Sequence, residues 1–270
     1  ARSWFGKLGY EDVGDDFRAD MGFMPRVGYR TAIGGLERIW HGESGDWYNR
    51  IRFGGDIDRT EDQQGRLLEE EYELFFNYQG PREGGVWLGP GTRRKVFDGV
   101  EFDQTYLSWS GWVQATADLF LNAWGFVGDG IDFTHTRPGD RFRVGLFSRY
   151  TFGDHLRTTL QHDFRRLDVE GGRLFEANLS RIRAVYQIDL RTFVRAIVEY
   201  RDITRNPELY ADPVEAQTED VFTQLLLSYK INPRTVAFLG YSDNYRGTRD
   251  ISLTQENRAL FFKVSYAWLL

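Results

Sequence analysis

The sequence has no cysteine, only 7 prolines and no long run of apolar residues. Without cysteine, disulfide scaffolds and zinc sites built on thiolates are excluded, and the chain can cross an oxidising periplasm without mispairing. No segment approaches the ~18 consecutive apolar residues of a membrane helix. With a mean hydropathy of -0.50, the sequence therefore excludes a helical membrane protein.

Lysine is also scarce, so arginine carries nearly all of the positive charge. The lysines are Lys7, Lys95, Lys230 and Lys263, among 34 basic residues that face 40 acidic ones. The resulting net charge of -6 gives no excess of positive charge that could bind a nucleic-acid backbone, which excludes DNA and RNA as partners.

What the sequence does contain is alternation of polar and apolar residues with a period of two. Between residues 141 and 152, the even positions are mainly apolar, and the odd positions carry Arg141, Arg143 and Arg149. A stripe with the 3.6-residue period of a helix appears nowhere. The pattern therefore predicts an all-β protein.

The alternation predicts about fourteen strands, most of them ten residues or longer. Strands in soluble sandwiches cluster near 5 to 6 residues, whereas a tilted membrane strand needs ~9 to 11. We therefore expect a transmembrane, antiparallel, up-and-down β-barrel in the bacterial outer membrane. The predicted ranges are 2–11, 26–40, 46–59, 65–79, 82–90, 101–111, 113–127, 140–152, 155–168, 173–188, 191–204, 218–231, 234–246 and 256–270.

The links between these strands favour the same architecture. Short turns at residues 153–154, 189–190 and 232–233 alternate with longer polar segments at 128–140, 206–219 and 247–255. Outer-membrane barrels place short turns in the periplasm and long loops outside.

Aromatic residues gather near the predicted strand ends, as at Tyr150, Tyr186, Tyr229 and Tyr266. Rings with a polar tip suit the headgroup level of a bilayer, so these residues indicate an aromatic girdle. The alternative is the ordinary aromatic core of a large soluble sandwich.

The last segment alternates to the end of the chain, with Tyr266, Trp268 and Leu270 on its apolar face. It resembles the C-terminal signal that the barrel-assembly machinery recognises in outer-membrane proteins, although Leu270 stands where an aromatic residue usually ends that signal. The resemblance implies this machinery as a partner during insertion. A buried last strand of a soluble sheet is the alternative.

A second resemblance covers most of the chain. It depends on residues 15–26 (Asp-Asp-Phe-Arg-Ala-Asp-Met-Gly-Phe-Met-Pro-Arg), with Tyr29-Arg30, and on the segments 229–235, 240–245 and 262–268. Together these are similar to the C-terminal barrel of an uncharacterised outer-membrane family, which commonly follows a domain similar to family-nine carbohydrate-binding modules. The resemblance implies one barrel domain over residues 1–270, at the C-terminal end of a longer chain. It implies no catalytic residues and no cofactor.

In such a barrel the polar face lines the lumen, and its charges are segregated along the chain. Acidic residues gather early and arginines later, which would set a transverse field that favours polar solutes. The alternative is an inert network of ion pairs that fills the lumen. The residues predicted to line the pore are Arg50, Arg52, Asp56, Glu69, Glu71, Glu73, Arg141, Arg143, Arg149, Arg157, Arg165, Arg181, Arg183, Arg195 and Arg201.

Three functions remain open. The first is a channel for small polar solutes, with saccharides suggested by the module that the related proteins carry. The second is a sealed barrel that anchors a binding domain in outer-membrane lipid and lipopolysaccharide. The third is a lipid-facing hydrolase that uses His162, Asn178 and Ser180, which share the apolar parity of their strands. The 4 histidines are scattered, and no metal site is predicted.

Overall fold

A computed structural model describes residues 2–267 except 19–21, 23 and 25. Fourteen strands follow one another in sequence order, each hydrogen-bonded to the next and antiparallel where the register is resolved. The described helical structure is a single 3-10 turn, Pro207–Leu209, and no described helix is long and apolar enough to span a membrane. The all-β class and the up-and-down topology predicted from the sequence are confirmed.

The strands are long throughout, at 12 to 16 residues each. Their bounds are β1 (Arg2–Val13), β2 (Tyr29–His41), β3 (Arg50–Asp62), β4 (Leu67–Gln79), β5 (Gly85–Phe97), β6 (Val100–Gln114), β7 (Leu119–Asp132), β8 (Arg137–Phe152), β9 (Leu156–Val169), β10 (Gly172–Gln187), β11 (Thr192–Arg205), β12 (Gln217–Asn232), β13 (Thr235–Thr248) and β14 (Thr254–Tyr266). Part of the 15–26 segment, and the end of the terminal segment from Trp268, lie outside the described residues.

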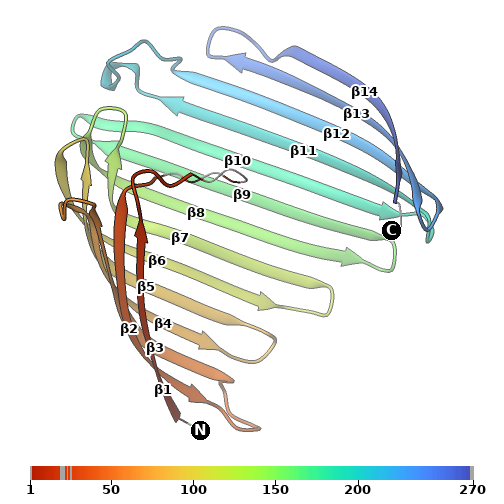
Figure 1. The fold of residues 1–270 in the computed structure, drawn as a ribbon. Coiled ribbons are helices and arrows are strands. Elements are labelled where there is room, and N and C mark those ends of the chain that lie inside the picture. The colour runs from red at the N-terminus through yellow and green to blue at the C-terminus, as the bar shows by residue number, and fades with distance from the viewer. Residues whose placement is uncertain (1, 19–21, 23, 25, 268–270) are drawn as a thin grey trace. The chain divides into compact units, whose positions relative to one another are not determined.

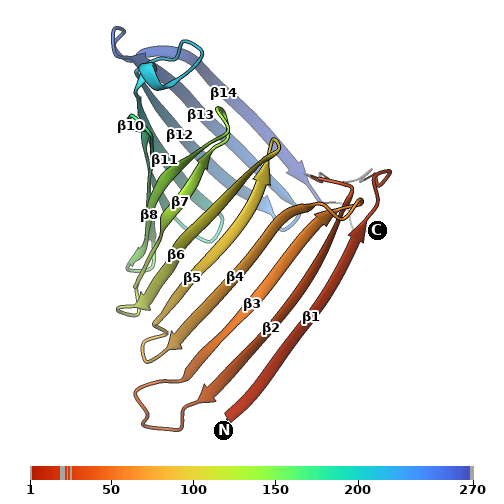
Figure 2. The same ribbon diagram turned by 90° about the vertical axis from the view of Figure 1, so that its left-hand side faces the viewer.

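The chain divides into two compact units, which are described separately. The first unit comprises residues 1–112 and 124–142, and the second comprises 113–123 and 143–270. Strands β1 to β6 of the first unit lie side by side in Figure 2, and strands β9 to β14 of the second unit lie side by side in Figure 1.

In the first unit, the strand register separates a charged face from an apolar face. Asp56 lies opposite Glu73, and Asp58 lies opposite Glu71, so these carboxylates share the charged face. The residues between them along the strands, Ile57 among them, form the apolar face, whose large side chains are exposed. The exposed large residues of this face on β2 to β4 are Leu36, Phe53, Ile57, Tyr72 and Leu74.

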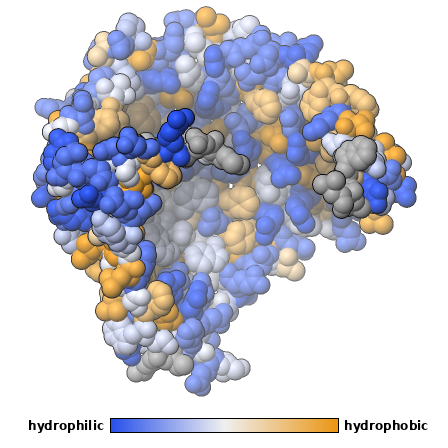
Figure 3. Space-filling view, viewed as in Figure 1, coloured by the Kyte–Doolittle hydropathy of each residue, from blue (hydrophilic) through white to orange (hydrophobic). Residues whose placement is uncertain are grey.

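The second unit repeats this division. Arg181 lies opposite Glu199, and Arg201 lies opposite Asp220, which places them on a charged face. Ile182 and Leu225 lie on the other, apolar face and are 53% and 52% exposed. Figure 3 shows hydrophobic side chains in groups at the surface among hydrophilic ones. A continuous exposed apolar face marks contact with lipid or with another protein.

The structure corrects the predicted end of the fifth strand, because β5 continues to Phe97 instead of ending at residue 90. Aromatic rings cover Gly89 and Gly91 within this strand: a Cβ atom at either position would clash with Trp87 or Tyr106. The strand ends at a two-residue turn, Asp98-Gly99, where both residues have positive φ. Asp-Gly is a typical sequence for this kind of hairpin turn.

The predicted long loop at residues 128–140 is also wrong, because β7 and β8 extend through it to a turn at residues 133–136. Asp132 is 3% exposed and organises this turn. Its carboxylate accepts a hydrogen bond from the Thr134 backbone N–H at 3.1 Å and one from Arg137 Nε at 2.9 Å. The glycines and the proline of the segment lie within strands instead of forming a loop.

The predicted alternation of short and long links therefore holds only in part. The second unit does carry a long segment between β11 and β12, at residues 206–216. However, the two-residue turn Glu170-Gly171, between β9 and β10, lies at the same end of the unit. Near that turn, Leu209 packs with the buried Leu167 and Leu174, which ties the long segment to the strand ends.

Candidate functional site: the charged faces of the two units

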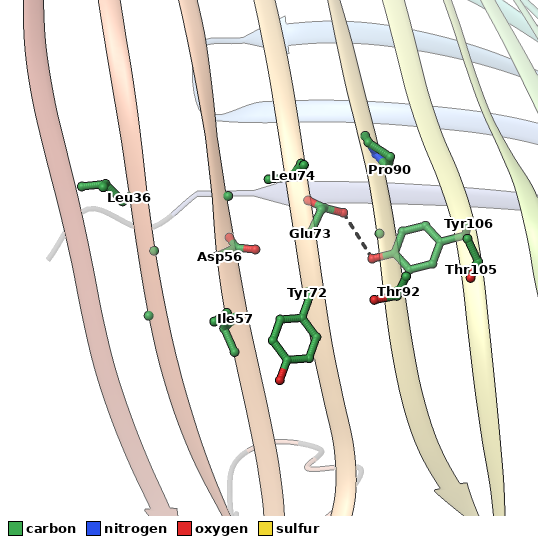
Figure 4. A pocket seen from close by; sticks show the side chains of 14 residues that line it. Leu36, Asp56, Ile57, Tyr72, Glu73, Leu74, Pro90, Thr92, Thr105 and Tyr106 are labelled. Atoms are coloured by element: carbon green, nitrogen blue, oxygen red, sulfur yellow. Dashed lines mark hydrogen bonds between the residues drawn. The ribbon is translucent and has the colours of Figure 1, made fainter.

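The charged face of the first unit centres on a ladder of carboxylates around one tyrosine. Tyr106 Oη donates a hydrogen bond to Glu71, and it lies 3.4 Å from Glu73 Oε2 (Figure 4). Lys95 Nζ lies 2.8 Å from Glu69 Oε2, and Arg93 Nη1 lies 3.6 Å from Glu69 Oε1. The three predicted glutamates therefore do share one face, and the far end of their ladder is neutralised by two cations.

Arg52 extends this charged face and is paired. Its Nη2 atom lies 2.6 Å from Oε2 of Glu37, a residue that is only 7% exposed. Arg50 lies two residues earlier on the same face, and its buried Nε has no hydrogen-bond partner among the described residues. Asp56 lies between Gly35 and Glu73 in the register.

A hollow of about 760 Å³ lies over β2 to β6 of the first unit. Gly34, Gly55 and Gly91 are among the residues that line it, and Pro90 lies where the ladder between β4 and β5 is interrupted. Proline has no N–H to donate, so it is rare inside a sheet. Leu36, Ile57, Tyr72 and Leu74 line the hollow (Figure 4), so much of its surface is apolar. The polar side chains of Asp56, Glu73, Thr92, Thr105 and Tyr106 also line it.

In the second unit, some of the predicted arginines are held in ion pairs across strands. Asp163 contacts both Arg143 Nη2, at 2.7 Å, and Arg165 Nε, at 2.6 Å. Arg181 Nε lies 2.7 Å from Glu199 Oε2. Asp220 likewise joins Arg201 to Arg246, at 2.6 and 2.9 Å. For these arginines, the structure resembles the ion-pair network considered as an alternative.

Other predicted arginines have no carboxylate partner among the described residues. Arg195 Nη2 donates to Gln224 Oε1 at 2.8 Å, and Arg149 lies over the Phe120 ring with its Cζ 5.3 Å from the centroid. Arg157 and Arg183 make no ion pair or side-chain hydrogen bond in the described part of the chain. Both line a second cavity, of about 310 Å³.

Arg141 belongs to the first unit and lies over an aromatic ring. Its Cζ is 3.7 Å from the centroid of Phe126, which stacks on Tyr106. Together these contacts extend the charged face of the first unit with a cationic group over aromatic rings.

The set of pore-lining residues predicted from the sequence does not include the carboxylates that pair with these arginines, although the alternation of the strands indicates them. Glu37, Asp163 and Asp220 fall on the same alternating positions as the arginines that they bind. Parity along a strand would have assigned each of them to the charged face. Which arginine each carboxylate binds depends on the strand register, which the sequence does not state.

On the apolar face of the second unit, two polar side chains meet. Ser180 lies opposite His162 in the register, and His162 Nδ1 is 2.9 Å from Ser180 Oγ. Asn178 is two residues from Ser180 and lies opposite Phe164. The structure thus joins two of the three residues considered for a hydrolase, and no hydrogen bond joins Asn178 to either of them among the described residues.

In the described residues, no three histidine, aspartate or glutamate side chains form a group able to hold a metal ion. The chemistry that the two charged faces offer is the binding of polar or charged groups.

No family model matches the chain, and no curated protein matches it. Solved structures with some similarity include an outer-membrane expressed OmpT of Vibrio cholerae (12% identity, 99% of this chain and 95% of that chain, TM-score 0.45). They also include the outer membrane channel DcaP of Acinetobacter baumannii (11% identity, 98% and 97%, TM-score 0.48). A third is an anion-selective porin from Comamonas acidovorans (9% identity, 99% and 100%, TM-score 0.43). Because these TM-scores are low, the fold assignment rests on the strand pairing itself.

Proposed function

We propose that this chain is an outer-membrane β-barrel that forms a channel for small polar solutes. The observation that carries the proposal is the separation of the two faces, with charged ladders on one and exposed apolar side chains on the other in both units. A lipid environment makes such an apolar face favourable along strands of this length, and in a closed barrel the charged face then surrounds water.

The charged faces support a polar solute, because arginine and glutamate ladders retain water and disfavour apolar molecules. The ion pairs at Asp163 and Asp220 stiffen the wall and leave other groups available for a solute. Saccharides remain a proposal from the family resemblance alone.

Single-channel conductance of the refolded protein in a planar lipid bilayer tests this function. Discrete conductance steps support a water-filled lumen, and Glu71→Lys should then shift the ion selectivity toward anions. Glu70→Lys is the matched control, because Glu70 is the adjacent residue on the other face of β4, beside Arg59. An inserted barrel that never conducts would overturn the channel and support a sealed anchor.

We propose lipid-ester hydrolysis as a second candidate function, supported by the contact between His162 and Ser180. The pair lies where the apolar face ends: Leu160 and Ile182 precede it, and Arg166 lies opposite Glu176 beyond it. The ester groups of phospholipids occupy such a boundary between apolar and polar layers. A histidine that accepts the serine proton activates the hydroxyl as a nucleophile.

Release of fatty acid from phospholipid vesicles by the refolded protein tests this second function. His162→Ala and Ser180→Ala should each abolish the release, whereas Thr158→Ala, on the same face of β9, should not. Release that survives both substitutions would exclude the pair from the reaction.

A further inference from the structure

We infer that Arg157 and Arg183 form a binding site for a small carboxylate or phosphate anion on the charged face of the second unit. The inference deepens the proposed channel, because it names the class of solute that the charged face would recognise. It starts from two arginines that differ from their neighbours in having no ion pair or side-chain hydrogen bond within the described part of the chain.

The two arginines come from neighbouring strands and lie close together. Arg157 on β9 lies opposite Val185, and Arg183 on β10 lies opposite Thr159, so the arginines are diagonal neighbours on one face. Diagonal neighbours in an antiparallel pair are ≈ 7–8 Å apart at Cα, within reach of long side chains. Two guanidinium groups can therefore approach one anion from adjacent strands.

Both arginines are exposed and are free of internal partners in the described part of the chain. Other arginines of the same face are occupied: Arg165 binds Asp163, Arg181 binds Glu199, and Arg201 binds Asp220. A free guanidinium offers five N–H donors in a planar fork that matches the paired oxygens of a carboxylate or phosphate. The charge that the fold leaves uncompensated is therefore positive and locally concentrated.

A cavity of about 310 Å³ gives these donors a bounded site. Thr159, between the two arginines, adds a hydroxyl that makes no other side-chain hydrogen bond in the described residues. Asp154, in the turn between β8 and β9, is the one carboxylate among the lining residues, and it makes no ion pair with either arginine. The volume lies at the lower limit of small-molecule pockets, which suits a small anion.

The surroundings add further positive potential. Arg195 lies opposite Val185 on the next strand, and among the described residues its guanidinium donates to the neutral Gln224. Its buried Nε has no hydrogen-bond partner in the described structure. Because arginine stays protonated at all accessible pH values, the site stays cationic wherever the ligand is ionised.

Isothermal titration calorimetry of the refolded, detergent-solubilised protein at low ionic strength tests the site directly, because it measures the dissociation constant of the anion. Succinate and inorganic phosphate serve as separate probes, because each presents paired oxygens to a guanidinium group. The double variant Arg157→Gln, Arg183→Gln should bind the recognised anion at least about tenfold more weakly, since it loses two charge-assisted contacts. Neither arginine has an internal partner among the residues that the structure describes, so the variant should fold normally.

The matched control is the double variant Arg165→Gln, Arg201→Gln, which removes the same charge from the same face. Asp163 keeps Arg143, and Asp220 keeps Arg246, so neither carboxylate is left alone. The control should change the affinity by less than about threefold. Equal losses in both variants would overturn the site, because binding would then be diffuse attraction to the whole face. A wild-type protein that binds neither probe would overturn it as well.

Conductance in planar bilayers separates this inference from the proposed channel. Anion binding without conductance supports the site and overturns the channel. Conductance without anion binding supports the channel and overturns the site. If both hold, millimolar additions of the bound anion should reduce the small-ion current of the wild type and leave that of the Arg157→Gln, Arg183→Gln variant unchanged.

Discussion

Arg143 Nη2 lies 2.7 Å from Asp163 Oδ2, in an ion pair that joins β8 to β9. Asp163 is only 5% exposed, and Arg165 contacts its second oxygen. The Asp163 carboxylate is therefore desolvated and contacts two guanidinium groups in place of water, whereas the side chains of Arg143 and Arg165 remain partly exposed to solvent. Burial is unequal within this cluster, so its members should not contribute equally to stability.

We expect removal of both arginines to destabilise the protein more than removal of the aspartate. Arg143→Gln with Arg165→Gln leaves a buried charge unpaired and should cost about 2–4 kcal/mol, whereas Asp163→Asn frees two partly exposed arginines and should cost about 1 kcal/mol. Urea unfolding of the refolded barrel measures both free energies. Equal costs would contradict the assigned asymmetry.

Replacing Gly91 by alanine should disturb the tyrosine at the centre of the carboxylate ladder. An added Cβ atom would lie 2.5 Å from Cζ of Tyr106, so the ring must move away from its hydrogen bonds to the glutamates. We expect a loss of about 1–3 kcal/mol in the free energy of unfolding. Gly6→Ala is the control, because its nearest neighbour would be Gly35 O at 3.9 Å, and it should be neutral or slightly stabilising.

An arginine placed on the apolar face should be costly in lipid. Ile182→Arg should lower the free energy of unfolding in lipid vesicles by about 2–4 kcal/mol, because its side chain then meets hydrocarbon. Ser242→Arg is the control, since Ser242 lies opposite Gln224 and Ala259 on the charged face, with no cation directly opposite. If the two variants lose the same stability, the proposed lipid contact is wrong.

The turn between β10 and β11 should add a pH-dependent contribution to stability. The backbone N–H of Arg191, at 2.7 Å, and the backbone and hydroxyl of Thr192 hold the pKa of Asp189 below its ordinary value. A carboxylate with a depressed folded pKa stabilises the protein above its unfolded pKa, and this stabilisation is lost as the pH falls through the folded pKa.

Urea unfolding at neutral and at acidic pH measures this effect. The wild type should be more stable than Asp189→Asn at neutral pH, and the difference should shrink below the ordinary pKa of aspartate. A difference that is independent of pH would show that the turn does not depend on the ionised carboxylate.

Much of the architecture follows from alternation alone. Alternate residues of an extended chain point to the same face. Glu69, Glu71 and Glu73 therefore necessarily share a face once β4 has formed. The same logic placed the arginines of β9 to β11 together. Strand ends were predicted less well, because the glycines and proline at residues 89–91 disfavour a strand locally. Gly91 is covered by the ring of Tyr106, which only the pairing of β5 with β6 brings near.

The partners of each charged residue were decided by the tertiary structure. Sequence parity does not distinguish Arg165, which binds Asp163, from Arg157, which has no carboxylate partner in the described residues. The difference arises from register, since a shift of two residues between strands keeps every face and exchanges every partner. The contact of His162 with Ser180 has the same origin, because it exists only where β9 and β10 align these residues directly opposite each other.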